Sequence, residues 1–179
     1  MKPFITPKVN ETGKKLLQFQ LEGGEQDSDL CAMHSRSITA YSMPEGHTFN
    51  AAWEFQLHFG NDNLLVEFSS ACTQVADWQE AGSLNIRMAY YGESIASIGS
   101  AHSATAISPF TVERLEKLVY EDDDVISECG LILNGSDGTA IIFAAGISPG
   151  SVSVAAPFAT GQFNPQFSLA ACSRKILYT

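Results

Sequence analysis

Apolar and polar residues alternate more regularly over residues 51–69 than anywhere else in the chain. In AWEFQLHF every second residue is apolar, and Glu54, Gln56 and His58 lie between them. A period of two places alternate side chains on opposite faces of a β-strand. GNDN at 60–63 favours a turn, because Gly and Asn tolerate positive φ. We therefore predict a β-hairpin whose buried face carries Trp53, Phe55, Leu57, Phe59, Leu64, Val66 and Phe68.

Further segments show strand-like patterns. Residues 128–146 hold the turn-forming run NGSDG between two apolar stretches, which predicts a second hairpin. ACTQVADWQEAG at 71–82 is compatible with a short helix or an irregular crossing, and part of the Gly/Ser-rich stretch 93–108 is read as strand. Single strands are predicted at KLLQFQLEGG (15–24), SRSITAYSM (35–43), SLNIRMAYYG (83–92) and SVSVAAPF (151–158), and EGGEQDSD (22–29) is expected to be a polar loop.

The segment SPFTVERLEKLVY, at about 108–120, predicts one main helix. Ser108 can cap its N-terminus, and Pro109 suits the first helical position. Its apolar residues fall on one helical stripe, and its charged residues point outward. The stripe comprises Val112, Leu115, Leu118 and Val119, and the outward set comprises Glu113, Arg114, Glu116 and Lys117.

These predicted elements indicate an α+β fold in a single globular domain of residues 1–179. Hairpins without alternating helices favour a mostly antiparallel sheet, with the main helix packed on one of its faces. We find no repeat and no linker in the sequence that would divide the chain.

The charge of the chain is negative and unevenly distributed. The net charge is −10, and residues 37–173 alone hold fifteen acidic side chains against three basic ones, a net charge of −12. Like charges repel, so this composition argues against nucleic acid or an anionic membrane as the partner. It favours a basic protein partner.

No cofactor or metal is expected from the sequence. No two of the four cysteines lie within 40 residues of each other, whereas structural zinc sites use closely spaced ligand pairs. The pair Cys31–His34 in CAMH has no second pair. The chain begins without an apolar signal segment and has no run long enough to span a bilayer, so we expect a cytoplasmic protein with reduced cysteines.

The common catalytic templates do not fit either, and no catalytic residue is assigned. The one G-x-S-x-G match, GISPG at 146–150, is followed by a predicted strand rather than a helix and so is not a nucleophile elbow. The glycines of GLILNGSDG lie in a predicted hairpin turn rather than between a strand and a helix. Whether a pocket forms around His34, His47, His58 or His102 is left open.

The run YEDDD places four carboxylates together at 121–124. The run lacks the alternating ligands of a calcium loop, so a metal site is disfavoured. A charge run is most often a solvated loop. Its functional interpretation is a docking surface for cationic side chains, made by Glu121, Asp122, Asp123 and Asp124 together with the nearby Glu128.

The acidic charge, the YEDDD run and the hairpin CGLILNGSDGTAIIFAAG followed by SVSVAAPF resemble bacterial immunity proteins of polymorphic toxin and contact-dependent inhibition systems. The resemblance implies a non-catalytic protein that neutralises a cognate toxin, in particular a nuclease, by occupying or covering its basic active-site region. Tight binding also needs apolar anchors. Phe158 and Phe163 are the candidates, followed by Phe167.

Two alternatives remain open. One is a small enzyme or ligand-binding domain whose site is assembled from distant residues, which a deep polar pocket around His or Cys would favour. The other is a structural or assembly protein, for example of phage origin, which self-assembly would favour. The oligomeric state is left undetermined by the sequence.

Overall fold

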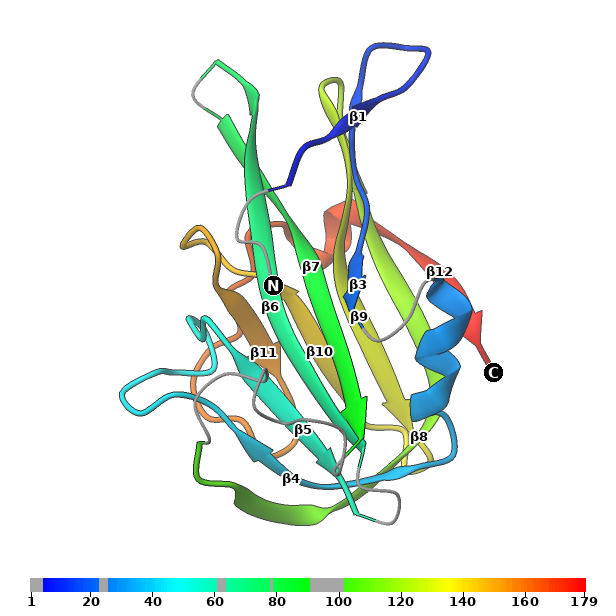
Figure 1. Cartoon of the computed structure of the whole chain (residues 1–179), viewed down its shortest axis with the longest axis vertical. Helices are drawn as coiled ribbons and strands as arrows, with labels where there is room; N and C mark the ends of the chain where they lie inside the picture. Colours follow the sequence, from blue (N-terminus) through cyan, green and yellow to red (C-terminus); the bar gives the residue numbers. More distant parts are fainter. Residues whose placement is uncertain (1–4, 23–25, 61–63, 78, 91–101) are drawn as a thin grey trace.

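The computed structural model describes residues 5–22, 26–60, 64–77, 79–90 and 102–179. Over these ranges the protein is mostly β-structure: twelve strands form one sheet that curls over to face itself (Figure 1). The two halves of this sheet, here called the first and second layers, are joined by the long strand β8 (Thr105–Glu121).

The first layer has the strand order β8–β4–β5–β6–β7–β3, and its pairings are antiparallel except for the last. Phe55 pairs with Phe68, and Leu57 with Val66, so the predicted 51–69 hairpin is confirmed. The strands are β3 (Gln20–Glu22), β4 (Ser37–Ser42), β5 (Phe55–Phe59), β6 (Leu64–Ala76) and β7 (Gln79–Tyr90).

The second layer has the order β12–β8–β9–β10–β11, and the short strand β2 pairs in parallel with β9 beside β10. The predicted hairpin at 128–146 is confirmed as β9 and β10. The bounds are β1 (Lys8–Val9), β2 (Lys15–Leu17), β9 (Val125–Gly135), β10 (Ala140–Ala145), β11 (Val152–Ala155) and β12 (Cys172–Tyr178).

The core lies between the two layers. Phe143 on β10 stacks on Phe68 of β6 at 3.8 Å between ring centroids, and its ring is 5.6 Å from that of Phe55. All three side chains are fully buried. The apolar faces of the two predicted hairpins therefore pack against each other, rather than against a helix.

The predicted main helix at 108–120 is wrong, because this segment is part of β8. Val112 pairs with Gly135 and Arg114 with Asn134, which leaves Glu113 as the extra residue of a β-bulge. The bulge shifts the alternation by one residue, so Val112 and Leu115 face the same core with a helix-like spacing of three. Leu118 belongs to a separate apolar cluster with Cys129 and Ile132.

The fold class is therefore mostly β, not α+β. Two charged residues that the helix would have exposed, Glu116 and Lys117, are buried in β8. The helical elements among the described residues are short 3₁₀ segments, η1 (Asp27–Met33) and η3 (Leu169–Ala171). A strand buried on both faces shows a nearly continuous run of buried residues, and this run imitates a helical stripe.

Three other expectations change. The 71–82 segment is neither helix nor irregular crossing, because it continues β6 and begins β7. The 15–24 strand is divided into β2 and β3, which pair with different layers. Trp53 precedes β5 and is 65% exposed rather than buried. Residues 61–63 of the predicted turn, 23–25 of the polar loop and 93–101 of the Gly/Ser-rich stretch lie outside the described residues.

Candidate functional site

A row of polar side chains crosses the outer face of the first layer. The register pairs Ser42 with Gln56, Gln56 with Glu67, Glu67 with Arg87, and Arg87 with Glu22. Five neighbouring strands thus contribute one residue each to a single line, here called the polar row. Gln56 and Glu67 are each only 4% exposed, so these groups need partners within the protein.

Hydrogen bonds and ion pairs connect the polar row. The Gln56 amide Nε2 donates to Glu54 Oε1 at 2.7 Å and to Glu67 Oε2 at 3.3 Å. Arg87 Nη1 is 3.9 Å from Glu67 Oε1, and Arg87 Nε is 3.3 Å from Glu22 Oε2. A single amide therefore bridges two carboxylates, and a single arginine lies between two others.

The direction of these bonds determines the protonation of His58. Both Nε2 hydrogens of Gln56 point to carboxylates, so its Oε1 must accept the Ser42 hydroxyl hydrogen at 2.9 Å. Ser42 Oγ also lies 2.9 Å from His58 Nε2. Because the Ser42 hydroxyl hydrogen is donated to Gln56, Ser42 Oγ acts as the acceptor in its contact with His58. Burial lowers the pKa of His58 and so favours the neutral ring, which carries its proton on Nε2 when it donates to Ser42 Oγ. In this tautomer Nε2 is a donor to Ser42 rather than a base.

Glu67 is the buried glutamate of the polar row, whereas Glu22 is exposed. Its burial raises its pKa, and the neighbouring carboxylate of Glu54 adds to this effect; Arg87 and the Gln56 amide oppose it. A raised pKa means that the ionised carboxylate is destabilised where it lies, and a nearby cation counteracts this effect.

A cavity of about 310 Å³ opens beside Glu54 and Glu67. Its volume is at the lower end of the range of small-ligand pockets. The exposed indole of Trp53 lies at this cavity and contacts the ring of His47 at 5.6 Å between centroids. The lining residues are Trp53, Glu54, Glu67, Ser69, Ser70, Asn85, Pro149 and Gly150.

A histidine lies beside one carboxylate of the cavity. His102 Nε2 is 3.5 Å from Glu54 Oε1, the same oxygen that accepts the Gln56 amide. Two of the four histidines left open by the sequence, His58 and His102, thus contact the polar groups next to the cavity, although neither lines it.

None of the seven residues predicted to bind a partner lines this cavity. The acidic run forms the turn between β8 and β9, and Asp122 Oδ1 accepts the backbone N–H groups of Asp124 and Val125, each at 2.9 Å. Partial burial opposes ionisation of Asp122, but these hydrogen bonds outweigh it and lower its pKa. Glu121 pairs with Lys14 at 2.9 Å. Asp123 and Asp124 are exposed.

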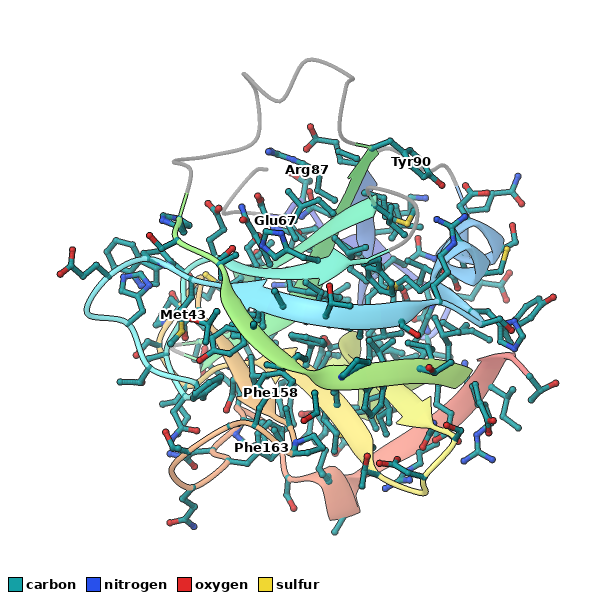
Figure 2. The ribbon with its side chains drawn as sticks, turned by 90° about the horizontal axis from the view of Figure 1, so that it is seen from below. Met43, Glu67, Arg87, Tyr90, Phe158 and Phe163 are labelled. Atoms are coloured by element: carbon teal, nitrogen blue, oxygen red, sulfur yellow. The ribbon has the colours of Figure 1, made fainter. Side chains whose placement is uncertain are left out.

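The other three predicted residues lie in different surroundings. Glu128 accepts hydrogen bonds from the Phe19 backbone at 2.7 Å and from Lys117 Nζ at 2.8 Å, so both of its carboxylate oxygens have internal partners. Phe158 is half-buried and stacks on Tyr41 at 5.0 Å. Phe163 is also half-buried. Figure 2 shows Glu67 and Arg87 together on one side of the strands, and Phe158 and Phe163 on the other side.

The Cys31–His34 pair falls in and next to η1. His34 contacts Ser35 Oγ at 3.0 Å through Nδ1, and its ring lies 4.5 Å from that of Tyr178. In the described part of the chain, no group of three or more His, Cys, Asp or Glu side chains is placed to hold a metal ion.

The residues of the polar row were visible in the sequence only as the polar members of alternating strands. Gln56 and Glu67 occupy such positions in the 51–69 hairpin, and Arg87 does so in 83–92 together with the cavity residue Asn85. The signal that distinguishes these residues is the burial of a Glu and a Gln on a strand face that the sequence predicts to be solvated. This burial is known only from the tertiary structure.

Among the described residues, no helix is both long and apolar enough to cross a bilayer. Comparison of the chain with models of protein families, with curated proteins and with solved structures gave no match.

Proposed function

We propose that the protein is a non-catalytic binding protein, and that its acidic cavity accepts a cationic side chain of a basic protein partner. The observation that carries this proposal is that two carboxylates, Glu54 and Glu67, share one cavity of about 310 Å³ and one bridging amide. The resemblance to immunity proteins implies a cognate toxin, in particular a nuclease, as the partner.

The energetics of the cavity support a cationic guest. Glu67 is almost fully buried, and its repulsion by Glu54 is only partly offset by Arg87. A guanidinium or ammonium group placed between the two carboxylates forms charge-assisted hydrogen bonds and removes this repulsion. The exposed Trp53 indole at the cavity adds an aromatic surface of the kind that binds cations most strongly.

The hydrogen-bond directions around Ser42 support binding rather than catalysis. A serine nucleophile needs a neighbouring base that takes its proton. Here the Ser42 proton is held by Gln56, and His58 presents an N–H to the same oxygen.

The test uses a pair of ligands that differ only in charge, N-acetyl-arginine amide and its neutral isostere N-acetyl-citrulline amide. We expect the arginine compound to shift the NMR signals of the Trp53 indole and of the Ser69 and Asn85 amides, and the citrulline compound to leave them unchanged. Glu54→Gln should abolish these shifts. Glu113→Gln, which neutralises an exposed glutamate outside the cavity, should preserve them.

Equal shifts from both ligands would show that charge does not select the guest, and the proposal would fail. Shifts confined to residues 121–124 would move the cation site to the β8–β9 turn and would also reject the cavity. The same titration with a basic peptide then compares a protein segment with the isolated side chain, and stronger binding of the peptide is expected.

A further inference from the structure

Two cysteines that are 43 residues apart in the sequence lie next to each other in the second layer. Cys129 Sγ on β9 is 3.7 Å from Cys172 Sγ, the first residue of β12. Cys129 is 2% exposed, whereas Cys172 is half-buried. The other two cysteines, Cys31 and Cys72, are respectively exposed and buried, and neither contributes to this pair.

Local backbone irregularity brings the two sulfurs together across β8. Leu118 pairs with Gly130 and Val119 with Glu128, which leaves Cys129 as the extra residue of a β-bulge. On the other side of β8, Cys172 follows the short segment η3 and starts the edge strand β12. Because β12 and β9 flank β8, bonding the two sulfurs at about 2 Å requires the backbone to move. Cys172 is the side that can move, since β12 is an edge strand paired only with β8.

The electrostatics of the pair are asymmetric. Either thiol can donate across the 3.7 Å contact, and Leu118 O and Ser168 O also lie within reach of Cys129 and Cys172 respectively. The contact with Cys129 lowers the pKa of Cys172 despite its partial burial. The same contact, together with burial, raises the pKa of Cys129. Cys172 therefore carries the more accessible sulfur and ionises more readily. The Cys129 thiol beside it stays protonated.

We propose that Cys129 and Cys172 form a reversible disulfide that ties the edge strand β12 to β9. The oxidant is a low-molecular-weight disulfide. The Cys172 thiolate attacks one of its sulfurs, forms a mixed disulfide and releases one thiol. Cys129 then loses its proton and attacks the Cys172 sulfur, which releases the second thiol. Two protein thiols are thus oxidised while one external disulfide is reduced to two thiols.

The test equilibrates the whole protein with oxidised and reduced glutathione, and then alkylates the remaining thiols under denaturing conditions. Wild-type protein should fall from four alkylated cysteines to two, and peptide mapping should show Cys129 linked to Cys172. The disulfide closes a loop of 43 residues, so the midpoint of thermal unfolding should rise by roughly 10 °C on oxidation and return on reduction.

Matched variants separate this pair from the other cysteines. Cys31→Ser should still lose two alkylation sites on oxidation, whereas Cys172→Ser should lose none. A stable glutathione adduct on Cys172 with Cys129 still alkylated would overturn the proposal, and so would four alkylated cysteines in oxidised wild-type protein. Because the decisive mapping uses the wild-type protein, a variant that fails to fold leaves the test intact.

Discussion

Replacement of Lys117 tests the corrected fold most directly. Its side chain is 4% exposed. Its Nζ lies 2.8 Å from Glu128 Oε1, forms an ion pair with Asp27 and lies 4.6 Å from the Phe19 ring centroid. On the predicted helix the same lysine would face solvent. Truncation of a solvated lysine changes stability by no more than about 0.5 kcal/mol.

In the observed strand the cost of Lys117→Ala is much larger. Removing one partner of a buried ion pair costs about 3–5 kcal/mol, because the other charge stays buried. Glu128 keeps the Phe19 N–H and is 19% exposed, and Asp27 is 45% exposed. Since both carboxylates retain some solvation, we take the lower end, about 3 kcal/mol. For a domain of this size that loss lowers the thermal midpoint by about 6–12 °C.

The assay is urea denaturation of wild-type protein and three variants. Lys117→Met keeps the aliphatic stem but not the charge, so it should retain part of the stability lost in Lys117→Ala. Lys175→Ala is the matched control, because Lys175 is the exposed register partner of Lys117 on β12. If Lys117→Ala lies within about 0.5 kcal/mol of wild type, as Lys175→Ala should, the buried-lysine account is refuted.

Three further outcomes are expected. Phe143→Ala should cost about 3–5 kcal/mol in denaturant unfolding because its fully buried ring stacks on Phe68, whereas Ile147→Ala, 60% exposed, should cost under about 0.5 kcal/mol; equal costs would contradict the packing of the two layers. Glu67 has a raised pKa in the folded state, so the folded protein binds the proton more tightly than the unfolded chain, and stability falls as pH rises from the ordinary value of 4.5 to the folded pKa. Glu67→Gln should remove this fall, and parallel stability–pH curves for variant and wild type would show that Glu67 does not cause it. Asp122 has a lowered pKa, so the part of its contribution that depends on ionisation is complete above the ordinary value of 3.8 and is lost as pH falls through the folded pKa. Asp122→Ala should cost about 1 kcal/mol at neutral pH in the same assay and less at a pH below both values, while a cost that does not fall in acid would show that the charged carboxylate is not responsible.

Local pattern alone was enough for the two hairpins. The alternation over 51–69 and the turn residues NGSDG within 128–146 act between neighbours in sequence, so they specify β5–β6 and β9–β10 wherever the rest of the chain goes. The sequence also shows which side chains of a strand share a face, and Phe55 and Leu57 are buried together as that rule requires.

The same rule failed at 108–120, because two non-local features altered the pattern. A bulge at Glu113 gave Val112 and Leu115 a spacing of three, and cover on both faces of β8 buried Leu118 as well. Periodicity cannot distinguish this arrangement from an amphipathic helix, since both present apolar residues three and four apart.

The candidate site and the cysteine pair were decided only by the tertiary structure. Gln56, Glu67 and Arg87 form one row because their strands adopt a particular register. Cys129 lies near Cys172 because their strands, β9 and β12, pair with the two opposite edges of β8. A sequence determines which way a side chain points from its own strand. Which strand lies beside it depends on contacts between residues far apart in the chain, and those contacts form only when the sheet closes on its core.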